Sequence, residues 1–178
     1  MLKNAIKHFI LITHHKWIVF KLCCKIGQPW RGITHDLSKY SPTEFGESIK
    51  YYVGNHSPIT EAKKDKGYSE AWLHHKGRNR HHTEYWIDEN APDSTPIMPY
   101  KYAAEMICDK LAAGIVYEGK KWTKEYELSY WNGEKEHIDI NPKLKDFVTK
   151  VLEEVAEYGI DKTINKKNIK SLYNKYCE

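Results

Sequence analysis

The first 26 residues carry apolar side chains at helical spacing, with no break before Gly27. Both sides of the expected helix, about residues 2–26, are apolar, and a helix of this kind is usually buried at the centre of a fold. His15 would then lie among apolar neighbours. One face holds Leu2, Ile6, Phe9, Thr13, Trp17 and Phe20, and the other holds Leu11, His15, Ile18 and Leu22.

Helix signals continue along most of the remaining chain. Ser41-Pro42-Thr43-Glu44 is a capping box with proline in the first turn, and residues 100–117 follow the 3.6-residue period. Residues 120–140 are less regular, and the Asn132-Gly133 turn signal indicates a short hairpin there. Further helices are expected at 33–40, 42–53, 57–66, 69–75, 79–88, 142–159 and from about 163 onward, with a loop at 90–99.

We therefore predict an all-α fold, a helical bundle with one domain over residues 1–178. Its core would lie at about 2–117, and the segment from 118 to 178 would cover that core. A length of 178 residues fits one domain. An apolar content of 40% with 13% aromatic residues argues against wholesale disorder.

Charge and hydropathy exclude some classes of protein. A mean hydropathy of −0.73 excludes an integral membrane protein, and the apolar run Phe9–Thr13 is too short to span a bilayer. The net charge of +4 suits an anionic partner but is too small to indicate nucleic acid. The four cysteines form no disulfide framework in a chain of this size, which favours a reducing setting. We expect a cytoplasmic protein with no membrane partner.

Histidines supply the candidate chemistry. Eight of the ten histidines lie between His14 and His82. His35-Asp36 is a weak signal alone, but His15 and Asp109 occupy the apolar faces of two predicted helices. A buried carboxylate is costly unless it is paired or binds a metal. Together the four residues form an imidazole–carboxylate set that suits Mn, Fe, Zn, Ni or Co.

A second histidine group follows at residues 74–82. His74-His75 and His81-His82 flank a break at Gly77, which lets two helix ends approach one point. One histidine of each pair could bind a metal, with the others orienting the ligands. The alternative is a basic loop that binds anions without metal.

The order His15, His35-Asp36, a histidine, a histidine, Asp109 resembles the HD-domain superfamily of metal-dependent phosphohydrolases. His35-Asp36-Leu37-Ser38-Lys39 is similar to the HD-x-G-K signature of members that act on cyclic dinucleotides, and the likeness covers about residues 11–117. It implies an all-α fold with the metal site between helices. It also implies that His15, His35, Asp36 and Asp109 bind one metal, while Asp36 bridges to a second held by His75 and His82. The alternates are His74, His81 and His14, with His56 ranked lower.

The sequence differs from the family pattern at two places, and each difference limits what the resemblance implies. No Gly-Tyr-Pro block follows the histidine pair, so cyclic-dinucleotide hydrolysis is not carried over. Lys39 stands where single-metal nucleotidases of the superfamily have a glutamate, so their acid–base assignment does not transfer either. The chain is also similar to a small branch of the superfamily in which HDLSK, SPTEF and HHKGRN form fixed blocks.

The leading hypothesis is hydrolysis of a small phosphoester by a water bound to one or two divalent metal ions, with Asp36 at the centre. His74 or His81 would protonate the leaving group. A nucleotide is the favoured substrate, because Trp72, Tyr85 and Trp86 could stack on a base. Phosphate would be bound by Lys39, Lys76, Arg78, Asn79 and Arg80.

Two other hypotheses stay open. The same ligand order resembles the mixed-valent diiron oxygenases of the superfamily, in which two irons would occupy the site. A non-enzymatic module that binds nucleotide or nucleic acid through residues 76–82 is the third reading, although no DNA-binding motif supports it. A homo-oligomer is possible under each hypothesis.

Overall fold

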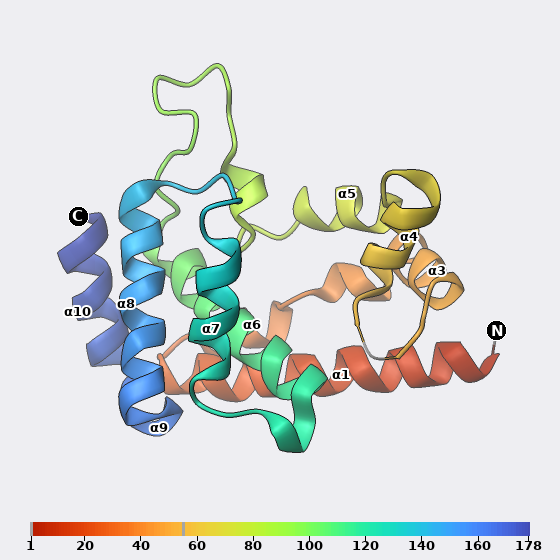
Figure 1. The fold of residues 1–178 in the computed structure, drawn as a ribbon, viewed down its shortest axis with the longest axis horizontal. Coiled ribbons are helices and arrows are strands. Elements are labelled where there is room, and N and C mark those ends of the chain that lie inside the picture. Colours follow the sequence, from red (N-terminus) through yellow and green to blue (C-terminus); the bar gives the residue numbers. More distant parts are fainter. Residues whose placement is uncertain (1, 55) are drawn as a thin grey trace.

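The computed structural model describes residues 2–54 and 56–178, and these residues form an all-α fold without strands (Figure 1). The predicted fold class is confirmed. The α-helices are α1 (Leu2–Lys25), α2 (Pro29–Thr34), α3 (Pro42–Lys50), α4 (Pro58–Lys66), α5 (Glu70–Lys76), α6 (Tyr100–Glu118), α7 (Tyr126–Glu134), α8 (Pro142–Tyr158), α9 (Ile160–Thr163) and α10 (Lys166–Cys177). Short 3₁₀ helices are η1 (Leu37–Tyr40), η2 (Thr83–Trp86) and η3 (Gly119–Lys121).

Helix α6 lies at the centre of the fold and packs on α1. Helices α7, α8 and α10 gather at one end, and α3, α4 and α5 gather at the other (Figure 1). Helix α2 crosses α1 closely, because a Cβ at Gly32 would lie only 2.6 Å from the Phe20 Cα. This close crossing holds the end of α2, and with it His35, against the middle of α1.

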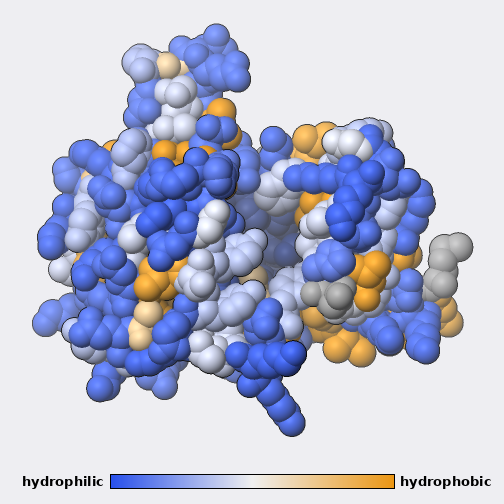
Figure 2. All heavy atoms as spheres, viewed as in Figure 1, coloured by the Kyte–Doolittle hydropathy of each residue, from blue (hydrophilic) through white to orange (hydrophobic). Residues whose placement is uncertain are grey.

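One face of α1 is exposed, although both faces were predicted to be buried. The face of Leu11, His15, Ile18 and Leu22 points inward, and three of these four residues are buried. The other face was predicted to be buried as well, but Leu2, Ile6, Phe9 and Trp17 expose between 50% and 76% of their surface. The packing partners of α1, namely α2, α3 and α6, leave that face uncovered. Figure 2 shows hydrophobic residues at the lower right edge, over the N-terminal half of α1.

Predicted helix starts are confirmed at several caps. The Ser41 hydroxyl accepts a hydrogen bond from the Glu44 backbone N–H at 3.3 Å, and Ser69 accepts one from Trp72 at 3.1 Å. Asn165 caps α10 in the same way. These bonds satisfy N–H groups that have no partner within the helix.

The hairpin predicted near residues 120–140 is wrong. Asn132 and Gly133 lie inside α7. The Trp131 side chain is buried, and its Nε1 donates a hydrogen bond to Thr149 of α8 at 2.8 Å. This tertiary packing outweighs the local turn preference.

The helix predicted at 79–88 is reduced to η2, because the Asn79 amide bonds to Ser38 and His75 instead of capping a helix. The apolar core joins α1 and α6 to α8 and α10, for example through Val19, Leu111, Phe147 and Ile169. All four cysteines are free thiols, as predicted. None of the described helices is long and apolar enough to span a bilayer.

Candidate metal centre

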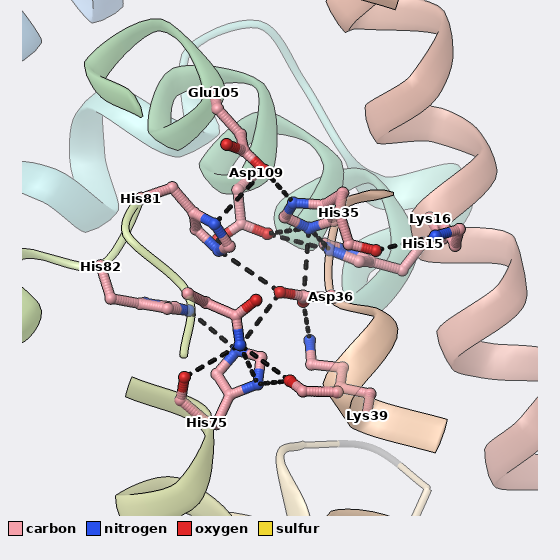
Figure 3. Close-up of polar contacts among 12 residues, drawn as sticks. His15, Lys16, His35, Asp36, Lys39, His75, His81, His82, Glu105 and Asp109 are labelled. Atoms are coloured by element: carbon pink, nitrogen blue, oxygen red, sulfur yellow. Dashed lines mark hydrogen bonds and ion pairs between the residues drawn. The ribbon is translucent and has the colours of Figure 1, made fainter. Parts of the chain in front are cut away.

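The His35-Asp36 pair lies at a break between two helices. His35 follows α2 with extended backbone angles, and Asp36 adopts a left-handed conformation with φ 51° before η1 begins. Successive side chains of a regular helix point in different directions. The break removes that restriction, so both side chains point into the same buried space (Figure 3).

The first cluster joins α1, the α2–η1 break and α6. The His15 Nε2 lies 2.9 Å from an Asp109 carboxylate oxygen and 3.3 Å from the His35 Nε2. The His35 Nε2 lies 3.3 Å from the Asp36 Oδ2 and 3.2 Å from the Asp109 Oδ1. The donor atoms of these four residues all lie within 4.8 Å of one another.

The second cluster joins Asp36 to the end of α5 and the loop that follows. The Asp36 Oδ1 lies 3.4 Å from both the His75 Nε2 and the His81 Nε2. The His75 Nε2 lies 2.9 Å from the His82 Nε2. All four residues fall into one group with ligand spacing. His81 therefore joins His75 and His82, where the resemblance implied one histidine from each pair.

The spacing of these atoms fits bound cations. Ligands about 2.1 Å from one ion lie about 3.0 Å apart at right angles and about 3.4 Å apart at the tetrahedral angle. The Asp36 Oδ1 and the His81 Nε2 are buried without a hydrogen bond, whereas the Asp36 Oδ2 has the Lys39 ammonium 2.7 Å away. Buried polar atoms rarely stay unsatisfied, so a divalent ion in the second cluster would supply the missing partner of both atoms.

Two glutamates outside the clusters orient the histidines. The fully buried Glu105 of α6 accepts a hydrogen bond from the His35 Nδ1 at 3.0 Å and lies 3.4 Å from the His81 Nδ1. Its other oxygen pairs with Arg31. Glu44 of α3 lies 2.8 Å from the His75 Nδ1. Such contacts direct the Nε2 atoms inward, as in many metal sites.

Sequence reasoning missed both glutamates as parts of a site. Glu44 was recognised as a capping-box residue, and its contact with His75 depends on how α3 packs against α5. Glu105 had a usable signal, because it precedes Asp109 by four residues and so lies on the same helical face.

The carboxylates of the site are held in their charged form. Burial alone would raise the pKa of Glu105, but hydrogen bonds with His35 and His81 outweigh it and lower the pKa to about 2. Burial opposes charge on Asp36 too, yet His35 and Lys39 hold its pKa well below the usual range. Burial lowers the pKa of His82, which keeps its imidazole neutral with a free lone pair.

The remaining predicted residues are distributed unevenly around the clusters. The Lys39 ammonium lies 2.7 Å from the Asp36 Oδ2, and the Asn79 amide contacts His75 from outside the cluster. His74 bonds to Glu44, at 2.6 Å, and stays out of the ligand groups. Arg78 contacts the His74 carbonyl, and Arg80 bonds to the Tyr102 hydroxyl.

Two neighbouring cavities, which we call the larger and the smaller lobe, open beside the clusters. The larger lobe, about 450 Å³, is lined by His81, Lys110, Glu127 and Trp131 among others. The smaller lobe, about 210 Å³, is lined by His15, Lys39, Trp72 and His75 among others. His82 and Asp109 border both lobes. Lys76, Arg78, Asn79 and Arg80 border neither, whereas His56 lines the larger lobe and His14 lies exposed on α1.

Comparison with known proteins identifies the family of the chain. No curated protein and no solved structure matches the chain. A family model matches residues 4–154, a range that contains every residue of both clusters. The chain therefore belongs to DUF5662, a family of unknown function.

Proposed function

We propose that the protein is a metal-dependent phosphohydrolase that acts on a nucleotide or another small phosphoester. The observation that carries the proposal is the position of Asp36, with Oδ2 toward His35 and Oδ1 toward His75 and His81. In two-metal hydrolytic sites, a carboxylate shared by two groups of ligands holds the ions close together.

His15, His35, Asp36 and Asp109 would hold one ion, and Asp36 with His75, His81 and His82 would hold the other. Mixed nitrogen and oxygen ligands suit Mn, Fe, Co, Ni or Zn. When bound, these ions bind phosphate oxygens and lower the pKa of a water so that hydroxide forms near neutral pH.

Lys39 is the residue we assign to the substrate phosphate. Its ammonium borders the smaller lobe beside Asp36. Burial would lower its pKa, but the Asp36 and Asp109 carboxylates outweigh burial and raise it, so the side chain stays charged. It would offset the negative charge that a phosphate brings into this lobe. Lys76, Arg78 and Arg80 border neither lobe, which makes Lys39 the stronger assignment.

Neither histidine predicted to protonate the leaving group fits that role in the structure. His81 lies among the ligands of the second ion, so its Nε2 carries no proton to donate. His74 bonds to Glu44 and borders neither lobe. Tyr117, Tyr126 and Trp131 line the larger lobe and would pack on the organic part of the substrate.

Metal content tests the proposal first. The purified protein is analysed by mass spectrometry without chelator, beside Asp36→Asn and the control Asp139→Asn, a matched change at an exposed residue. Asparagine tolerates the left-handed backbone of Asp36, so the variant keeps its local conformation. We expect one or two equivalents of metal in the protein and the control, and a loss of at least one in Asp36→Asn.

Activity is then measured as phosphate release from a panel of nucleoside monophosphates with Mn. Phosphate release that requires Asp36 supports the proposal. Failure to take up Mn or Fe would overturn it, and so would oxygen uptake by an iron-loaded protein that releases no phosphate. Nucleotide binding that survives chelation, without turnover, would favour a binding module instead.

A further inference from the structure

The outer face of α1 is apolar and exposed over most of the helix. Five large apolar side chains recur at intervals of one to seven residues and expose at least half of their surface: Leu2, Ile6, Phe9, Ile10 and Trp17. Their spacing places them on one stripe of the helix. A monomeric protein rarely exposes a continuous apolar stripe of this length without a partner for it.

The stripe continues onto η1. The Phe9 ring packs edge-on against the Tyr40 ring at 5.8 Å, and the Thr13 hydroxyl bonds to the Tyr40 hydroxyl at 3.1 Å. Leu37 lies three residues before Tyr40, on the same face of the 3₁₀ helix, and is 55% exposed. We call the stripe together with Leu37 and Tyr40 the outer face.

Basic residues border the outer face, and no acidic residue interrupts it. Residues 1–35 contain five lysines and one arginine, with neither aspartate nor glutamate. The first acidic residue of the chain is Asp36, which is buried in the metal centre. One edge of α1 carries residues 3, 7, 14, 21 and 25, all lysine or histidine, at spacings of four or seven. Lys3, Lys7 and Lys21 are exposed, whereas Lys25 pairs with Asp161.

We propose that the outer face docks on an anionic lipid surface, with α1 lying parallel to it. An apolar stripe bordered by lysines is the pattern of helices that lie in the headgroup region of a membrane. The apolar side chains would enter the boundary of the acyl chains, and the lysines would contact anionic headgroups. This proposal departs from our sequence-based expectation of no membrane partner, which rested on hydropathy, because docking of this kind requires no membrane-spanning segment.

A second copy of the chain fits the same face less well. A two-fold contact places the same surface patch on both partners. In an antiparallel pair the lysine edges of the two copies would lie on the same side, and residues 1–35 offer no carboxylate to pair with them. An anionic lipid surface satisfies both the apolar stripe and its charge.

Docking would leave the metal centre open to substrate. His8, Ile12 and His15 project from the inner side of α1 and line the smaller lobe. The stripe occupies the opposite side of the same helix. The protein would therefore rest on the surface with the smaller lobe directed away from the lipid.

The experiment is co-sedimentation of the full chain with phosphatidylcholine vesicles that do or do not contain phosphatidylglycerol. We expect binding to the anionic vesicles, loss of that binding at about 1 M salt, where charges are screened within about 3 Å, and weak binding to neutral vesicles. Phe9→Glu/Trp17→Glu should lower the binding at least tenfold. Both residues are half-exposed, and circular dichroism with metal content confirms that the variant is folded.

Charge variants distinguish binding through the outer face from general electrostatic attraction to the vesicle. Lys3→Glu/Lys7→Glu should lower the affinity at least tenfold, since each lysine near an anionic surface contributes roughly fivefold. Lys120→Glu/Lys121→Glu changes the net charge equally at two other exposed lysines and should keep the affinity. The proposal is overturned if the protein does not bind anionic vesicles or if both lysine pairs lose binding equally. It is also overturned if light scattering shows a dimer that Phe9→Glu/Trp17→Glu converts to monomer.

Discussion

Glu105 contacts one histidine in each of the two clusters of the candidate metal centre. Its carboxylate accepts from the His35 Nδ1 and lies near the His81 Nδ1, while Arg31 holds its other oxygen. A charged acceptor at Nδ1 fixes the tautomer that leaves Nε2 free and makes that nitrogen a stronger ligand. Glu105 therefore orients one histidine in each of the two clusters.

We predict that Glu105→Gln lowers the affinity for Mn by roughly 10–100-fold, the usual cost of losing such a partner. Glutamine keeps the size and one acceptor oxygen but loses the charge that polarises the imidazoles. The affinity is measured by competition with a chelator of known strength. Glu47→Gln serves as the control, because Glu47 is also a hydrogen-bonded glutamate but contacts Lys66 and Ser69. Equal affinities in all three proteins would contradict this role.

Glu127 gives a prediction for stability against pH. Burial raises its pKa to about 7 from an ordinary value of 4.5. Between those two pH values the folded protein holds a proton that the unfolded chain has released, so the free energy of unfolding falls as the pH rises through this window. Above pH 7 the cost of the buried charge is on the order of 3 kcal/mol.

Glu127→Gln removes this cost. The variant should match the parent near pH 4.5 and exceed its free energy of unfolding at pH 8 by up to about 3 kcal/mol. Urea unfolding at the two pH values measures the difference. Glu89→Gln, at an exposed loop residue, should show no pH-dependent gain, and a similar gain in both variants would count against the buried charge as its cause.

At the scale of elements, α6 and α7 meet at Gly114. A Cβ at this position would lie 1.5 Å from a Glu127 carboxylate oxygen, so the glycine provides the space that the side chain occupies. Glu127, Lys110 and Trp131 line the larger lobe along this contact. The packing of the two helices therefore sets the shape of the lobe that we assign to the substrate.

Gly114→Ala should lower the free energy of unfolding by about 1–3 kcal/mol, because the added methyl group displaces the buried Glu127 carboxylate from the space that it occupies. In a Glu127→Ala background the same change should cost much less. Gly133→Ala in α7 is the matched control, since nothing lies within 4 Å of its Cβ position; it should stabilise by about 0.5–1 kcal/mol. Equal effects of the two glycine substitutions in thermal unfolding would refute the contact.

The sequence predicted some elements well, and the reasons are local. Ser41 and Ser69 cap their helices through contacts three residues away, which a single sequence reveals. The hairpin prediction failed because Trp131 is held by Thr149, a residue from a helix far along the chain. His15, His35, Asp36 and Asp109 were found because helical spacing and a family resemblance both indicated them. Glu44 was not found, because its contact with His75 depends on the packing of two helices.

At the scale of the whole molecule, the candidate metal centre brings together segments that are far apart in the sequence. His15 comes from α1, Asp36 from the α2–η1 break, His75 from α5 and Asp109 from α6. Unfolding separates all four, so ions held by the two clusters would bind the folded chain far more strongly than the unfolded one. Binding of that kind is coupled to folding.

Removal of the metal should therefore lower the melting temperature. An ion present at a hundredfold excess over its dissociation constant stabilises by about 2.7 kcal/mol, which for a chain of this length corresponds to roughly 5–10 °C. Differential scanning fluorimetry with and without a chelator measures the shift. Asp36→Asn should show little response to chelator, because the residue shared by the two clusters is gone, whereas Asp139→Asn should respond like the parent. The shift should shrink as the pH falls below neutral, since protons compete with the ion for the imidazoles. If the melting temperature of the parent protein did not change with the chelator, that result would contradict metal binding by residues from these four elements.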